Sequence, residues 1–141
     1  MLKIPPLLQD LIDAGRWPRT PADMKWQNFH SWVSRARVQL LAPEEIAINF
    51  LPPPFRTVRE ECEENALFWN SSMAAPEGIE FDLTLVIGDF GIGSDAPILL
   101  DYSKELDNPR VLRLLWPNNG KDNKWVVMAT DFKTFADVLG L

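Results

Sequence analysis

Four short apolar stretches in the C-terminal part of the chain predict the strands of a sheet. They are Leu83–Ile87, Pro97–Tyr102, Val111–Trp116 and Trp125–Ala129, and turn residues such as Asn108-Pro109 and Pro117-Asn118-Asn119-Gly120 separate them. Connections of this length leave no room for crossover helices. The pattern therefore predicts an antiparallel β-meander.

Helical spacing flanks this meander on both sides. Pro5-Pro6, four apolar residues between Leu7 and Ile12, and then Gly15 predict a short N-terminal helix. At the other end, Thr130-Asp131 is a helix cap before Phe132–Leu139, and Gly140 follows as a stop. The chain thus begins and ends with a predicted helix.

Three further elements are expected between the first helix and the meander. Thr20-Pro21 predicts the start of a second helix, with Trp26, Phe29 and Val33 as its apolar stripe and an end between Trp32 and Leu41. Alternation from Ile46 to Phe50 predicts a strand, which Pro52-Pro53-Pro54 ends. Thr57 to Trp69 predicts a helix with Val58, Cys62, Ala66 and Trp69 on its apolar side. We expect one α+β domain over residues 1–141, a curved, mainly antiparallel sheet packed with N-terminal helices and a C-terminal helix.

Composition supports a folded domain of this kind. The chain has 141 residues, of which 46% are hydrophobic, with six Trp and eight Phe, enough apolar area to offset the entropy of folding. No apolar run approaches the roughly 20 residues that span a bilayer, and the N-terminus lacks the apolar region of a signal peptide. A single cysteine excludes an internal disulfide. We therefore expect a cytoplasmic protein without membrane contact.

Charge divides the chain unevenly and indicates a class of partner. The formal charge is -6, with six Lys and Arg against three Asp up to Pro43, and eight against seventeen Asp and Glu from Glu44 onward. The densest acidic cluster is Glu60, Glu61, Glu63 and Glu64. Such a surface repels nucleic acid and attracts a basic protein. Its simpler interpretation is a solvated helix face.

The segment Ile87–Tyr102 contains three glycines and three aspartates, and invites several chemical interpretations. Asp89-Phe90-Gly91 matches the magnesium motif of protein kinases, but the phosphate-binding lysine, the His-Arg-Asp loop and the two-lobed size are missing. Gly88, Gly91 and Gly93 have the wrong order for a dinucleotide fingerprint, and a strand rather than a helix follows. The simplest interpretation is a tight glycine turn with positive φ, in which Asp95 bonds the turn amides.

Other catalytic and metal-binding groups are few. Asp89, Asp95 and Asp101 recur every six residues, whereas an EF-hand loop places its ligands at every second residue. His30 is the only histidine and falls in a predicted helix, and Cys62 has no nearby base to form a thiolate. We therefore expect a protein that binds no cofactor and no metal and is not an enzyme. Catalysis is the weakest of the functions considered for this chain.

The C-terminal half resembles the SUKH superfamily and its SMI/KNR-like members. The matching segments are Leu85–Asp95, Ile98–Tyr102, Val111–Trp116, Trp125–Phe135 and Leu139–Leu141, with a weaker similarity at Pro52–Val58. Their order carries the resemblance: an apolar strand into a glycine turn, a strand that ends in Asp-Tyr, another strand, and a Phe-x-x-Phe helix. Little beyond an N-terminal helix matches before residue 52.

This resemblance implies an α+β fold and a non-enzymatic binding role. Many bacterial members are immunity proteins that block a cognate toxin, often a nuclease, whereas fungal members are regulators and interaction scaffolds. Toxin neutralisation and a regulatory or scaffold role both stay open for this chain. The resemblance transfers no contact residue, so charge alone nominates Glu60, Glu61, Glu63, Glu64 and Asp95 as candidate partner-binding residues.

Overall fold

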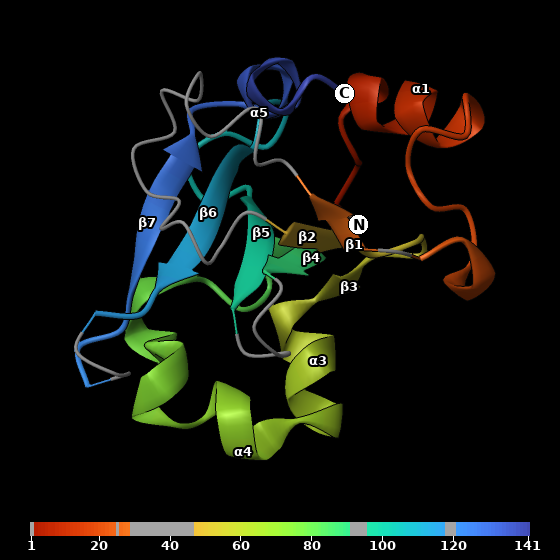
Figure 1. The fold of residues 1–141 in the computed structure, drawn as a ribbon. Coiled ribbons are helices and arrows are strands. Elements are labelled where there is room, and N and C mark those ends of the chain that lie inside the picture. The colour runs from red at the N-terminus through yellow and green to blue at the C-terminus, as the bar shows by residue number, and fades with distance from the viewer. Residues whose placement is uncertain (1, 25, 29–46, 91–95, 118–120) are drawn as a thin grey trace.

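The computed structural model describes residues 2–24, 26–28, 47–90, 96–117 and 121–141. Within them, seven strands form one sheet in the order β1-β2-β4-β5-β6-β7, with β3 also paired to β4 (Figure 1). The strands are β1 (Trp26–Asn28), β2 (Ala47–Phe50), β3 (Arg56–Thr57), β4 (Thr84–Phe90), β5 (Pro97–Asp101), β6 (Arg110–Leu115) and β7 (Lys124–Ala129). The helices are α1 (Pro6–Asp13), α3 (Val58–Glu64), α4 (Ala66–Trp69) and α5 (Phe132–Leu139), with 3-10 turns η1 (Pro21–Asp23), η3 (Ser72–Ala74) and η4 (Pro76–Gly78).

The predicted α+β class and the meander are confirmed. Strands β4, β5, β6 and β7 pair in chain order, and each of these pairings is antiparallel. Each of the four begins and ends within three residues of its predicted stretch. The first helix and the last are also confirmed, and Gly15 and Gly140 end them with φ values of 74° and 72°.

Both faces of the sheet are covered, which explains why β5 is buried at every position. Helices α1 and α5 lie on one side, and α3 and α4 lie on the other (Figure 1). The apolar side chains therefore form two cores. The first core lies between the sheet and helices α1 and α5 and contains Ile98 and Leu100 of β5, and the second core lies between the sheet and helices α3 and α4 and contains Leu99. The continuous apolar run in the sequence is therefore a strand between two layers.

Trp17 lies at the centre of the first core, just after α1. Its ring stacks on Phe50 of β2 with 4.1 Å between centroids and packs against Phe132 of α5. Its Nε1 donates to the carbonyl of Leu51 at 2.8 Å. One side chain therefore joins the segment after α1 to the sheet and to the C-terminal helix.

The second core holds α4 and η3 against the meander. Trp69 of α4 stacks parallel to Trp125 of β7, with 6.2 Å between centroids. Trp125 Nε1 donates to the carbonyl of Ala74 at 2.8 Å. These contacts fix α4 on the sheet, and α4 forms one wall of the site described below.

The predicted second helix is wrong where the structure describes it. Thr20 and Asp23 form a capping box, but they enclose only the 3-10 turn η1. Met24 then turns to extended backbone with ψ 132°, and Trp26–Asn28 pair with β2. Pairing with a strand far along the chain overrides a local helical stripe. The remainder of that predicted helix lies outside the described residues.

The predicted helix from Thr57 to Trp69 is two helices. Asn65 adopts φ -132° and ψ 54°, which ends α3 and begins α4. Asparagine favours such breaks because its side chain competes for backbone hydrogen bonds. The break turns Phe68 and Trp69 into the second core and leaves Ala66, predicted to be apolar-facing, exposed to solvent.

Replacing Asp131 with alanine should remove the cap of α5. Asp131 Oδ1 accepts from the backbone N–H of Thr134 at 2.7 Å, and hydrogen bonding to Thr134 lowers the pKa of the Asp131 carboxyl group. We expect the free energy of unfolding to fall by about 1 kcal/mol, measured by urea denaturation. Asp131→Asn keeps an acceptor and should lose less. Equal losses in both variants would contradict this role of the cap.

Candidate binding cleft

An extra residue in β4 changes which way its last side chains point. Val86 pairs with Leu99 and Gly88 pairs with Ile98, so Ile87 has no partner in β5 and forms a β-bulge. The carbonyl of Ile87 instead accepts from the N–H of Leu51. A bulge of this kind shifts the alternation of all following side chains by one position.

The bulge turns Asp89 away from the first core. A Cβ on Gly88 would lie 3.6 Å from Phe50, so Gly88 faces α1 and α5, as does Phe90. Asp89 lies between them on the opposite side, beside its partner Pro97 on β5. Its Oδ1 accepts from the N–H of Ala96 at 3.3 Å. Without the bulge, the aspartate would enter the apolar core.

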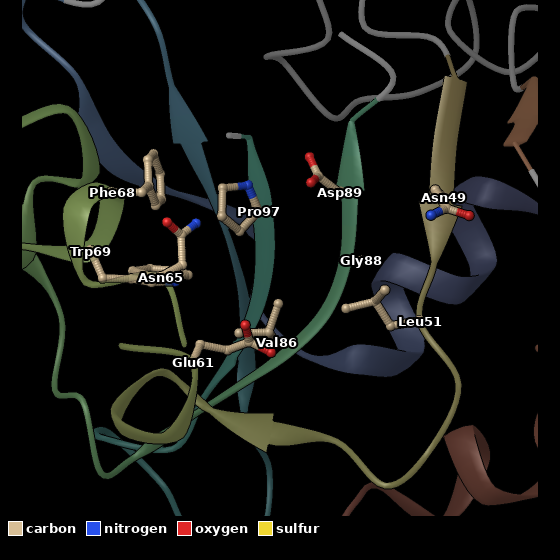
Figure 2. A pocket seen from close by; sticks show the side chains of 10 residues that line it. All are labelled: Asn49, Leu51, Glu61, Asn65, Phe68, Trp69, Val86, Gly88, Asp89 and Pro97. Atoms are coloured by element: carbon tan, nitrogen blue, oxygen red, sulfur yellow. The ribbon is translucent and has the colours of Figure 1, made fainter. Parts of the chain in front are cut away.

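A cleft of about 490 Å³ opens on this side of the sheet, between the strands and the α3–α4 pair. Its lining residues are Asn49, Leu51, Glu61, Asn65, Phe68, Trp69, Val86, Gly88, Asp89 and Pro97. Figure 2 shows Asp89 and Asn49 on the strand side, with Glu61, Asn65 and Phe68 on the helix side. The cleft therefore has carboxylate and amide groups on both walls and apolar side chains between them.

Helix α3 places Glu61 at the cleft through a well-formed N-terminus. Thr57 Oγ1 accepts from the N–H of Glu60 at 3.1 Å, and Glu60 Oε1 accepts from the N–H of Thr57 at 3.2 Å. This capping box satisfies two amides that the first turn would otherwise leave without partners. The Glu60 carboxylate is therefore engaged in capping the first turn of α3.

Arg56 of β3 lies beside the acidic side of α3. Its Nη1 is 2.6 Å from Oε2 of Glu64, and its Nη2 donates to the carbonyl of Glu60 at 3.1 Å. Its Nε is 4.0 Å from Oε1 of Glu61. Arg56 therefore pairs closely with Glu64 and only distantly with the cleft carboxylate.

The structure separates the candidate acidic residues into different roles. Glu60 is a helix cap, Glu64 pairs with Arg56, and Glu63 is exposed to solvent. Glu61 alone among the four glutamates lines the cleft. Asp95 lies outside the described residues.

Burial raises the pKa of Glu61 above its ordinary value. Desolvation is the largest cause, and Glu64 adds repulsion, while Arg56 acts in the opposite direction. The side chain is 26% exposed. Because the folded state binds this proton more tightly than the unfolded state, the Glu61 carboxylate costs stability at neutral pH, and that cost disappears as the pH falls below the unfolded pKa.

Replacing Glu61 with glutamine should leave stability at pH 7 unchanged or raise it by about 0.5 kcal/mol. The amide removes the desolvation cost but also the distant attraction to Arg56. We expect the difference from the unmodified chain to shrink as the pH falls through the raised pKa, measured by thermal unfolding across pH. Glu63→Gln, on the exposed side of α3, is the matched control and should show no such trend. A loss of more than about 1 kcal/mol in Glu61→Gln would contradict this assignment.

Two of the aspartates considered for a cation lie apart. Asp89 pairs with Pro97 at one end of the β4–β5 hairpin, and Asp101 pairs with Thr84 at the other end. Asp101 is buried and forms an ion pair with Arg110 at 2.7 Å. Asp101 is thus part of the scaffold, and within the described residues no three His, Cys, Asp or Glu side chains are arranged so that they could hold a metal ion.

The remaining predictions from the glycine segment and from Cys62 have mixed outcomes. Gly88 belongs to β4 and has no positive φ, so the predicted turn does not include it. Gly91 and Gly93 lie outside the described residues, as does His30.

Cys62 is half-buried against the second core, as a small apolar side chain would be, and its Sγ lies 3.5 Å from Asn70 Oδ1.

Several residues that line the cleft could not be identified as binding residues from the sequence. Asn49 and Asn65 are isolated amides. The strand that carries Asn49 was predicted, but its pairing with β4 beside Asp89 and the helix break at Asn65 appear only in the fold. Asp89 has an indirect signal, because a glycine inside a strand often marks a bulge. Leu67 of α4, which is 93% exposed beside Phe68, adds an apolar side chain to the same helix.

Comparison of the chain with protein-family models, with curated proteins and with solved structures found no match. None of the helices that the structure describes combines the length and apolar character of a membrane-spanning segment.

Proposed function

We propose that this chain is a non-enzymatic protein-binding domain that holds part of a basic partner in the cleft between α3–α4 and the sheet. The observation that carries the proposal is the cleft itself, about 490 Å³ in volume, with apolar walls and the carboxylates of Glu61 and Asp89. Clefts with a few convergent polar groups on apolar surface are typical binding sites. Leu67, the chain neighbour of Phe68 on α4, is 93% exposed and offers a partner a further apolar side chain to cover.

Electrostatics favours a basic partner. From Glu44 onward the chain has seventeen Asp and Glu against eight Lys and Arg, and these include Glu63 and Glu64, which are exposed on α3, the helix that carries Glu61. Complementary charge raises the rate at which partners meet and disfavours acidic competitors. A cationic toxin domain, such as a nuclease, has the matching charge.

The specific role that we propose is toxin immunity in the cytoplasm. The resemblance of the C-terminal half to SMI/KNR-like proteins supports it, because many bacterial members of that group neutralise toxins. The regulatory or scaffold role of other members predicts protein binding as well, but no protection from a toxin. The two roles therefore differ in a measurable outcome.

Co-expression tests this role directly. An immunity protein should be encoded beside a toxin with a polymorphic C-terminal domain, should rescue cells that express that toxin, and should form a complex with it on gel filtration. Cells that die equally fast with and without the chain, with no complex, would overturn the immunity role. So would the lack of any toxin gene beside this one, and a regulatory partner would then be the remaining form of the proposal.

A further inference from the structure

We propose that the cleft is a receptor for a guanidinium group, so that an arginine side chain of the protein partner inserts between Glu61 and Asp89. This inference rests on the proposed protein-binding function and names the chemistry of the contact. Three features of the cleft carry it: the acceptors on its walls, the charge balance around Glu61 and the apolar surface between the walls.

Hydrogen-bond acceptors line both walls. Asp89 and Asn49 are adjacent on paired strands, Glu61 comes from the middle of α3, and Asn65 is the break that follows this helix (Figure 2). Each carries at least one side-chain oxygen. Guanidinium has five N–H donors in a planar fork, so it can donate to both walls at once.

Among the described residues, the charge balance leaves Glu61 under-compensated. The arginine that faces it there, Arg56, is 4.0 Å away and pairs more closely with Glu64, at 2.6 Å. Burial raises the pKa of Glu61, and the attraction to Arg56, which acts in the opposite direction, is the smaller of the two effects. A cation in the cleft would supply the missing charge and lower that pKa.

Apolar side chains between the walls favour arginine over a compact cation. Val86 and Pro97 form the strand side of this surface, and Phe68 and Trp69 lie on the helix side. The weakly hydrated guanidinium plane and the methylene stem of arginine pack well on aromatic and aliphatic surface. Lysine carries a strongly hydrated point charge and should bind less well.

The probe for this site is Nα-acetyl-arginine amide, titrated into the ¹⁵N-labelled chain and followed by NMR. We expect saturable shifts of the side-chain amides of Asn49 and Asn65 and of the backbone amide of Asp89. Nα-acetyl-citrulline amide has nearly the same shape without the charge, and should bind at least about tenfold more weakly. The lysine compound should fall between them.

Variants locate the binding in the cleft. Glu61→Gln and Asp89→Asn remove one charge each while keeping size and an acceptor, and together should abolish saturation. Asp10→Asn with Asp137→Asn is the matched control, because both aspartates are exposed on α1 and α5, across the sheet from the cleft. The control should bind arginine amide as the unmodified chain does.

Two results of the titration would overturn the inference, and a third comes from the toxin complex. The first is equal shifts from the citrulline compound or from a calcium or magnesium salt, and the second is no saturable shift up to about 50 mM arginine amide. A toxin complex that forms normally with the Glu61→Gln, Asp89→Asn chain would overturn the arginine contact and leave the protein-binding function intact. Saturable arginine binding by a chain that forms no toxin complex would instead remove the immunity role and keep the receptor site.

Discussion

Replacing Trp17 with alanine is expected to lower the free energy of unfolding by about 3–5 kcal/mol. The side chain is 1% exposed and contacts the aromatic rings of Phe50, Phe55 and Phe132. Alanine would leave a cavity where α1, the sheet and α5 meet. It would also remove the donor to the carbonyl of Leu51.

Urea denaturation of Trp17→Ala and Trp17→Phe measures the loss of stability and separates the contribution of the ring contacts from that of the hydrogen bond. Phenylalanine keeps most of the ring contacts but has no N–H, so its loss of about 1–2 kcal/mol reports the hydrogen bond and the smaller ring. Leu51 lines the cleft, so Trp17→Ala should also disturb the cleft amides in NMR spectra. A loss below about 1 kcal/mol for alanine would contradict the central position of Trp17 in the first core.

Replacing Gly88 with valine is expected to lower the free energy of unfolding by about 1–3 kcal/mol and to displace Asp89 from the cleft. A Cβ at this position would lie 3.1 Å from the carbonyl oxygen of Asn49, a backbone atom of the paired strand β2. The two γ carbons of valine would press further into Phe50 and Ile98, which are 3.6 and 3.7 Å from that Cβ. Strand β2 would have to move away from β4.

Alanine at the same position separates the effect of the Cβ from that of the larger side chain. Gly88→Ala should be less destabilising than Gly88→Val, and both should shift the amide signals of Asn49 and Asp89, whose residues are paired on β2 and β4. Urea denaturation and NMR measure the two effects. A valine variant with unchanged stability and unchanged spectra would contradict the close approach of β2 and β4 at this bulge.

Much of the fold could be predicted because local and tertiary preferences agree there. The meander strands are short apolar runs between turn residues, and α5 begins at a capping aspartate and ends at a glycine. Strand β1 could not be predicted in this way. Its residues show a helical spacing, and their strand pairing depends on β2, which lies far along the chain.

The site was harder to predict than the fold, because single residues determine its geometry. The acidic run pointed to α3, but only Glu61 reaches the cleft, since capping and ion pairing use its neighbours. The bulge at Ile87 reverses the direction of Asp89, and the break at Asn65 reorients α4. Neither the bulge nor the helix break changes the hydrophobic pattern of the sequence enough to be predicted from that pattern.

The affinity of the proposed toxin partner for three forms of this chain tests the central claim, protein binding through the cleft, most directly. The forms are the unmodified chain, Glu61→Gln with Asp89→Asn, and the control Asp10→Asn with Asp137→Asn, each titrated by calorimetry. We predict that the cleft variant weakens binding about thirtyfold or more, while the control stays within about threefold of the unmodified chain. Equal affinities for all three forms would show that the partner binds elsewhere and would contradict this account.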